Sequence, residues 1–170
     1  MTLSRDRTSV ALGLTISGAL LRLLPHPPNV APVGAMSLFA GARLNGWQAW
    51  LMPLLLMAVT DPLVGGFSRS TPFIYASFLV SVWIGRSLRG TRRPLHIGAA
   101  AFLCALQFFL ITNLATWALG SMYPHTLAGL GACYIAALPF FGLTLAGNLF
   151  YAALFFGAHA WLARPAAEAA

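Results

Sequence analysis

The sequence predicts an all-α integral membrane protein, a single bundle of about six transmembrane helices. Three observations favour this fold class. Hydrophobic residues make up 59% of the 170 residues and charged residues only 8%, whereas a soluble domain carries about 25% charged residues. The mean hydropathy is +0.78. Apolar runs of helical length alternate with short segments rich in proline, glycine and arginine.

No shift in composition divides the chain, so residues 1–170 are predicted to form one transmembrane helical domain. The bundle covers 8–165, with short tails at 1–7 and 165–170. Each helix is an apolar run between helix breakers, such as the Pro-rich segment 23–35 and the Asn45-Gly46 turn. The predicted spans are 9–24, 32–44 (a short helix), 47–64, 73–88, 95–119 and 140–162.

The last apolar run, residues 126–163, would be roughly 57 Å long as one helix, nearly twice the hydrocarbon core. Pro139 lies near its middle and is expected to break it. Residues 126–138 are therefore predicted to form a short re-entrant or interfacial helix before the last span. Counting this helix as a span gives a seven-span alternative.

Arginine supplies all the basic side chains and sets the predicted orientation. Basic residues concentrate in cytoplasmic loops, which favours a bacterial cytoplasmic (inner) membrane protein with both termini in the cytoplasm. Seven spans would place Arg164 outside, against this trend. The first apolar run lacks a prompt signal-peptide cleavage motif and is predicted to stay as a helix. Arginines 5, 7, 43, 86, 89, 92, 93 and 164 then lie inside, and Arg22 and Arg69 outside.

Several function classes are excluded by the same residues. The net charge of +7 is spread over helix ends instead of one soluble face, which argues against nucleic-acid binding. Cys104 and Cys133 lie in apolar runs without metal-binding spacing, as small buried hydrophobes do. No nucleophile elbow, zinc-protease motif, phosphate-binding loop or carboxylate pair is present. The sequence therefore predicts neither an enzyme nor a resident cofactor or metal.

Polar side chains from several segments are expected at the external rim of the bundle. Asp61 is the most informative of them, because a carboxylate within a span is costly and faces a partner or a cavity. It either pairs with Arg22 or Arg69, contacts a ligand, or couples transport to an ion or a proton. The predicted substrate-binding residues are His26, Asn29, Asp61, Asn113, Tyr123, His125 and Asn148.

Two histidines and two alanines raise more specific expectations. His26 and His125 each follow a proline, which stiffens the backbone. Neutral imidazole binds cobalt and other metals, so cobalamin is the leading guess for the ligand, with at least one of these histidines in contact with it. Ala31 and Ala35 have the small-xxx-small spacing that lets membrane helices approach closely. They serve either internal packing or docking onto a partner membrane subunit.

Longer motifs resemble a known family. The segments LPHPPNVAPVGAMSLFAGA, DPLVGGFS, FFLITNLATWALGSMYPHTLAGLGACYIAALPFF and GNLFYAALFFG resemble those of an uncharacterised family of small bacterial membrane proteins. That family is distantly similar to the substrate-binding S-components of energy-coupling factor (ECF) vitamin transporters. The chain carries His125 where the family pattern has Lys, and Asn148 where it has Asp.

This resemblance implies a pocket in the outer half of the bundle, closed by loops, with the Pro-rich segment as a rigid wall. The expected function is uptake of a small nutrient, such as a vitamin, cofactor precursor or metal chelate. A transmembrane coupling subunit with ATPases would energise it, or the chain would work alone. The competing reading is a non-transporting scaffold or accessory subunit, and a third is an ion- or proton-coupled carrier that uses Asp61.

Overall fold

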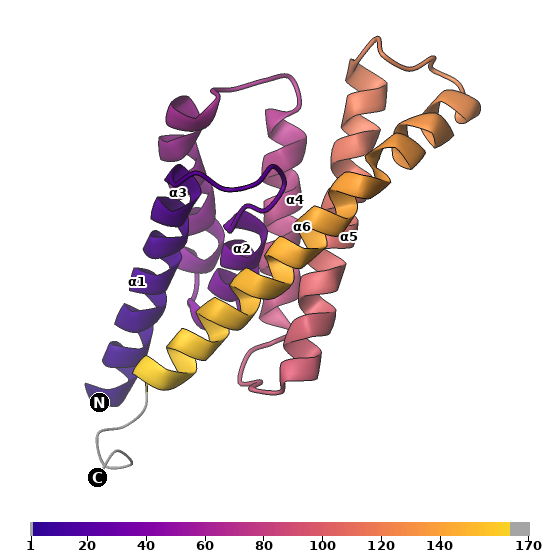
Figure 1. Ribbon diagram of the computed structural model, residues 1–170. Coiled ribbons are helices and arrows are strands. Elements are labelled where there is room, and N and C mark those ends of the chain that lie inside the picture. The colour runs from indigo at the N-terminus through magenta and orange to yellow at the C-terminus, as the bar shows by residue number, and fades with distance from the viewer. Residues whose placement is uncertain (1, 164–170) are drawn as a thin grey trace.

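The computed structural model describes residues 2–163, with side chains from residue 7 onward, and the described residues form helices without a strand (Figure 1). The predicted all-α class is confirmed. α1 begins at Thr2 and so includes the residues predicted as an N-terminal tail, and the predicted tail at 165–170 lies outside the described residues. The helices are α1 (Thr2–Leu23), α2 (Val33–Arg43), α3 (Gln48–Val64), α4 (Thr71–Arg86), α5 (Pro94–Leu119) and α6 (Leu127–Leu162).

The helices run alternately up and down, so that α1 begins and α6 ends at the same end of the molecule (Figure 1). We call this the lower end; it also holds the α2–α3 and α4–α5 turns. The upper end holds the three remaining connections, α1–α2, α3–α4 and α5–α6. The arginines described here divide between the two ends as predicted, with Arg22 and Arg69 at the upper end. Arg164 lies outside the described residues.

Helix α2 is the centre of the fold and packs against all five other helices. Its side chains Leu38 and Phe39 are fully buried. A Cβ atom added to Gly41 would collide with the carbonyl oxygen of Val82, and one added to Gly85 would collide with that of Leu38. The α2 and α4 backbones therefore touch where they cross.

The six-span bundle predicted from the sequence is not supported. Of the described helices, α5 with 26 residues and α6 with 36 residues are long and apolar enough to cross a membrane. Helix α3 is apolar but shorter. The 11 residues of α2 measure about 16 Å, about half of a 30 Å hydrocarbon core. Its apolar residues are buried against protein, a distinction that hydropathy does not make.

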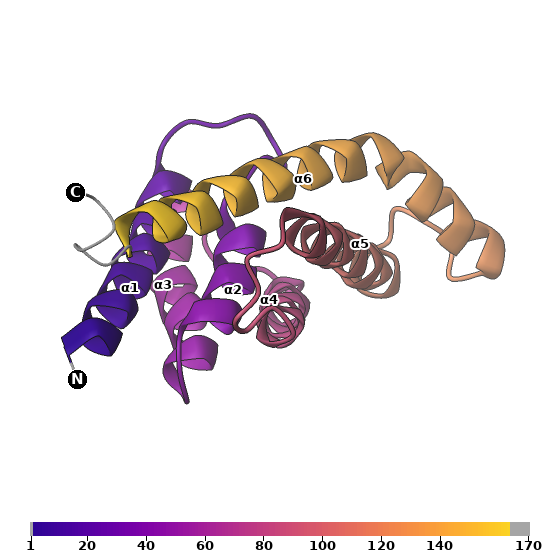
Figure 2. The ribbon, with the colours of Figure 1, turned by 90° about the horizontal axis from the view of Figure 1, so that it is seen from below.

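The prediction of a separate re-entrant or interfacial helix at residues 126–138 is wrong, because α6 is one continuous helix with Pro139 inside it. Proline removes one backbone hydrogen bond and bends a helix without necessarily ending it, and α6 curves in its first half (Figure 2). Contacts with α5 support this half: the Tyr134 hydroxyl donates to the Leu110 carbonyl at 2.8 Å, and the rings of Phe109 and Phe141 lie 5.2 Å apart. The upper halves of α5 and α6 form an arm that projects from the bundle in both views (Figures 1 and 2).

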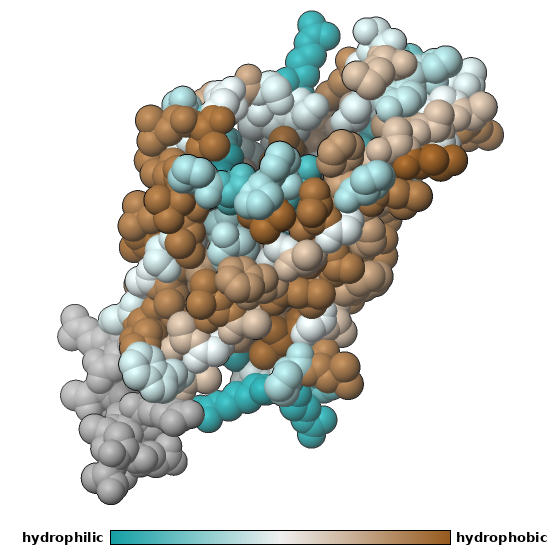
Figure 3. Space-filling view, viewed as in Figure 1, coloured by the Kyte–Doolittle hydropathy of each residue, from teal (hydrophilic) through white to brown (hydrophobic). Residues whose placement is uncertain are grey.

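The surface is apolar over most of the face in Figure 3, with hydrophilic side chains in its upper part and along its lower edge. Large apolar side chains are exposed on every helix except α2, including Val59 on α3, Trp83 on α4 and Phe150 on α6. A protein in water rarely exposes so much contiguous apolar surface. Together with the two helices of spanning length, this surface is a hint of membrane association.

Candidate functional site

Two neighbouring cavities open beneath the Pro-rich segment between α2, α4, α5 and α6. One has a volume of about 240 Å³ and the other about 250 Å³. We call them together the upper cavity, because Asn29, Phe108 and Thr144 line both. The polar residues of its walls are Arg22, Asn29, Ser81, Thr112, Asn113, Thr144 and Asn148, and aromatic rings come from Phe78, Phe108, Phe109, Phe140 and Phe141.

Asn29 reaches this position through a tight turn. The amide of Val30 donates to the carbonyl of Pro27 at 3.1 Å, and Asn29 has φ +64°. A turn with proline second and a left-handed third residue is of type II, in which glycine or asparagine is favoured. Val30 then packs against Gly147 of α6, where a Cβ would lie 3.1 Å from the Val30 Cα. The Pro-rich segment therefore packs against α6 and forms part of the wall of the upper cavity.

Asn148 on α6 is the most unusual side chain in the upper cavity. It is only 3% exposed, and it forms no hydrogen bond with any residue that the structure describes. A Cβ added to Gly34 would collide with its Oδ1, so the amide lies directly against the α2 backbone. The fully enclosed side-chain atoms without a partner among the described residues are those of Ser37 and Gln107, so the Asn148 amide atoms still reach the space of the cavity. A side chain of this kind facing a cavity is well placed to bind a ligand.

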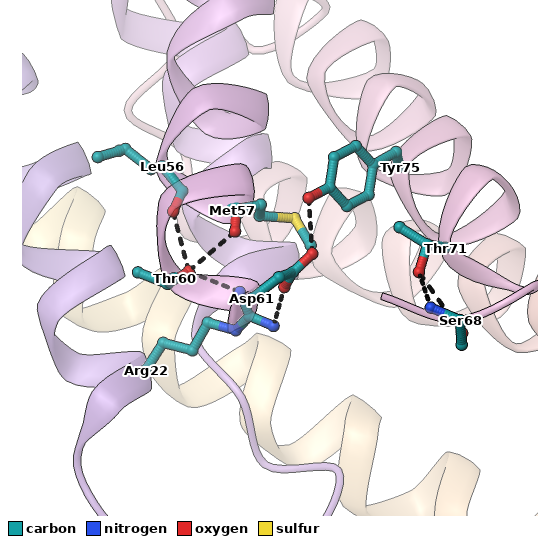
Figure 4. Close-up of polar contacts among 8 residues, drawn as sticks. All are labelled: Arg22, Leu56, Met57, Thr60, Asp61, Ser68, Thr71 and Tyr75. Carbon is teal, nitrogen blue, oxygen red and sulfur yellow. Dashed lines mark hydrogen bonds and ion pairs between the residues drawn. The ribbon is translucent and has the colours of Figure 1, made fainter. Parts of the chain in front are cut away.

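Asp61 is held by a network of polar contacts behind the wall of the upper cavity (Figure 4). One carboxylate oxygen accepts from the Arg22 guanidinium at 2.6 Å, and the other accepts from the Tyr75 hydroxyl at 2.6 Å. Arg22 also donates to the hydroxyl of Thr60 at 2.7 Å. Asp61 does not line the cavity, whereas Arg22 does. Of the alternatives left open by the sequence, this geometry favours the ion pair with Arg22.

Asn113 lines the same cavity from α5. Its amide nitrogen donates to the Phe109 carbonyl one turn earlier at 2.8 Å. Its side-chain oxygen Oδ1 accepts no hydrogen bond within the part of the chain that the structure describes. Asn29, Asn113 and Asn148 are thus the predicted binding residues that the fold brings together.

Three other predicted binding residues lie outside the upper cavity. His26 contacts the adjacent Pro27 carbonyl at 3.1 Å, and exposed His125 contacts the Gly120 carbonyl at 3.1 Å. Tyr123 lies in the α5–α6 connection with His125, and that connection is far from the α1–α2 connection in both views (Figures 1 and 2). The fold therefore does not bring His26 and His125 together at the upper cavity, and neither of them lines it. No metal-binding group of three or more ligand side chains occurs among the described residues.

The small-residue pair also needs correction. Ala35 is completely buried inside the molecule, and Ala31 lines the upper cavity. Ala35 cannot meet a partner subunit, because α2 is surrounded by the other helices, and Ala31 lies before α2 in the connection from α1. Internal packing explains the spacing. Cys104 and Cys133 are buried, as predicted.

The sequence analysis did not predict Arg22, Ser81 or Thr144 as residues that line a cavity. Ser81 follows Ser77 by one helical turn on α4, and both are buried. The side-chain amide nitrogen of Gln107 donates to the Ser81 hydroxyl at 3.0 Å. Hydroxyl residues repeated at four-residue spacing in an apolar helix were the available signal.

Comparison with known proteins gives a family. A family model described as "Family of unknown function (DUF6580)" matches residues 2–169 of the chain. No curated protein and no solved structure matches the chain. The function therefore has to be argued from the site itself.

Proposed function

We propose that this chain, which belongs to the DUF6580 family, is a membrane-embedded binding protein for the uptake of a small nutrient. The observation that carries the proposal is Asn148, an amide that is 3% exposed, faces a cavity and has no partner among the described residues. An amide that lies almost entirely inside the fold and keeps its hydrogen-bonding capacity free toward a cavity can orient a polar ligand. A ligand that hydrogen-bonds to this amide would use capacity that no described residue uses.

The walls of the upper cavity define the chemistry of this ligand. Asn29, Asn113 and Asn148 offer amide donors and acceptors, Arg22 offers a cation, and phenylalanine rings supply apolar contact area. A small, partly aromatic molecule with several hydrogen-bonding groups fits such walls. Drug-sized pockets measure about 300–1,000 Å³, and each half of the upper cavity is smaller. This volume favours a vitamin or precursor without a corrin ring over cobalamin.

The proposed setting is the bacterial cytoplasmic membrane, with the lower end in the cytoplasm. The lower end carries Arg43, Arg86, Arg89, Arg92 and Arg93, and basic residues concentrate on the cytoplasmic side. The upper cavity would then open to the outside. The distant resemblance to S-components extends the proposal to a transmembrane coupling subunit with ATPases as the energy source.

The test is to purify the protein from membranes in mild detergent and to identify co-purified small molecules by mass spectrometry. Asn148→Ala is expected to lower the affinity for the recovered compound about tenfold, the loss of one hydrogen bond of about 1.4 kcal/mol. Its stability should not fall, because Asn148 donates to no described residue.

Gln48→Ala is the matched control, since Gln48 also carries an amide, begins α3 at the lower end and does not line the upper cavity. Equal affinity of both variants for the compound would overturn the proposal. An empty upper cavity together with a stoichiometric partner protein would instead support the scaffold function.

A further inference from the structure

A second and larger cavity, of about 770 Å³, lies at the lower end. We call it the lower cavity. It is enclosed by α1, the end of α2, the α4–α5 turn, the start of α5 and the end of α6. Arg7, Arg43, Arg92 and His159 line it from four different segments, and none of the described residues that line it carries a carboxylate.

One of these arginines is held in place before any ligand arrives. The Arg43 guanidinium donates to the carbonyls of Leu88 at 3.1 Å and Thr91 at 2.7 Å, and lies over the Phe156 ring at 4.8 Å. These neutral contacts orient the cation without neutralising it. Asp61 is the one residue with a carboxylate among those whose side chains are described. It is paired with Arg22 at the opposite end of the molecule.

The side of the lower cavity formed by α5 and α6 is largely apolar and elongated. Its wall follows α6 from Leu149 through Ala153 to Ala160, about 17 Å of helix, with Ile97 of α5 opposite. Leu149 is 42% exposed, so this wall continues into the apolar outer surface. A cavity with cations at one end and an apolar wall that reaches the outer surface is complementary to an amphiphilic anion.

We propose that the lower cavity binds an anionic phospholipid, with the phosphate among Arg7, Arg43 and Arg92 and an acyl chain along α6. Basic pockets between helices on the cytoplasmic side of a membrane bind such headgroups. A soluble phosphate would use the arginines but leave the apolar wall uncovered. The inference rests on the membrane setting proposed above and is independent of the ligand in the upper cavity.

The experiment measures lipid binding to the detergent-purified full chain by native mass spectrometry. Phosphatidylglycerol and phosphatidylcholine with the same acyl chains are titrated separately, and glycerol 1-phosphate and inorganic phosphate serve as soluble anions. We expect phosphatidylglycerol to bind in preference to phosphatidylcholine. An R7Q/R92Q variant should bind phosphatidylglycerol about 30-fold more weakly, since each basic residue near an anionic headgroup contributes about 1 kcal/mol.

The matched control is R69Q/R93Q, which changes the net charge equally. Arg93 neighbours Arg92 but does not line the lower cavity, and Arg69 lies at the upper end. It should bind phosphatidylglycerol like the unchanged protein. A second variant, Gly157→Leu, keeps all charges and fills open space, because a Cβ at Gly157 meets nothing within 4 Å. It should also lose phosphatidylglycerol, and it decides the question if R7Q/R92Q does not fold.

Three results would overturn the inference. Equal binding of the two lipids would remove the role of headgroup charge. Equal losses in R7Q/R92Q and R69Q/R93Q would show that net charge alone matters. Soluble anions that displace phosphatidylglycerol completely at similar concentrations would identify a phosphate site without a lipid. Sedimentation with carbonate-washed membranes checks the membrane setting separately, so its failure is distinguishable from failure of the lower cavity.

Discussion

The upper and lower cavities present opposite solutions to placing charge in an apolar helical protein. At the upper end, the cation of Arg22 is matched by Asp61 within the protein, and the cavity adds neutral amides. At the lower end, Arg7, Arg43 and Arg92 line a cavity whose described lining residues include no carboxylate. The upper cavity is therefore suited to recognising a small molecule by hydrogen bonding. The lower one is suited to attracting an anion.

The largest expected effect comes from removing the charge balance at the upper end. Asp61→Ala leaves the Arg22 guanidinium and the Tyr75 hydroxyl without their shared acceptor. Breaking a buried ion pair in this way costs about 3–5 kcal/mol. We expect a strong decrease in the thermal unfolding temperature in detergent.

Asp61→Asn is the matched control, because it retains an oxygen that accepts a hydrogen bond and should lose less stability. Similar unfolding temperatures for Asp61→Ala and the unchanged protein would show that the pair is not structural. That result would favour the alternatives in which Asp61 contacts a ligand or couples transport to an ion or a proton.

A smaller effect on stability is expected where α2 and α4 cross, since α2 contributes residues to both cavities. Gly41→Ala places a Cβ on the Val82 carbonyl oxygen, so α2 and α4 must move apart. Overpacking a close contact costs about 1–3 kcal/mol. Since α2 contributes Val33 and Gly34 to the upper cavity and Arg43 to the lower one, binding at both ends should weaken.

Gly142→Ala on α6 is the control for helix propensity, because its Cβ meets nothing within 4 Å. It should leave the stability unchanged or raise it by up to about 1 kcal/mol. If Gly41→Ala is as stable as Gly142→Ala, the two backbones are not in the contact described.

Asn29 allows the backbone and the side chain of the upper wall to be separated. Asn29→Gly keeps the left-handed turn and removes the amide, so ligand affinity should fall severalfold with little loss of stability. Asn29→Ala should show the same affinity loss and also destabilise the protein by about 1–2 kcal/mol, because alanine is strained at φ +64°. Denaturation and ligand titration of both variants measure the two effects. Unchanged affinity in Asn29→Gly would remove Asn29 from the binding site.

The smallest effect is expected for the histidines. His26→Ala and His125→Ala should bind the ligand of the upper cavity with unchanged affinity, because neither residue lines it. Each makes a backbone contact at the protein surface, so stability should change by less than about 0.5 kcal/mol. A selective loss of ligand in either folded variant would restore the histidine-based site.

The sequence predicted the bounds of a helix well where residues that start or stop a helix lie directly at its ends. Helix α5 was expected at 95–119 and is found at Pro94–Leu119, because Pro94 suits a first helical turn and Gly120 follows its end. The rule that proline interrupts helices failed at Pro139. There the aromatic contacts between α5 and α6 support the bent helix, and such contacts are not visible in a local pattern.

The polar residues of the upper cavity were predictable as residues that are costly in an apolar protein, but not as neighbours. Asn29, Asn113 and Asn148 come from three segments that meet only because α2 is short and central. His26 and His125 had the same kind of sequence signal, but the projecting α5–α6 arm separates their connections. Sequence distance and topology do not specify which loops at one end converge.

Composition and local pattern alone therefore determined the helical class, most helix ends, and the separation of arginines between the two ends. These properties depend on hydrogen bonds and hydropathy within a few residues. Tertiary packing decided which apolar helix is buried in protein, that Asp61 is paired with Arg22, and that arginines from three distant segments line one cavity. Those outcomes depend on the burial of charge and on contacts between distant segments, and the free energy of each is set by the surroundings that the whole fold provides.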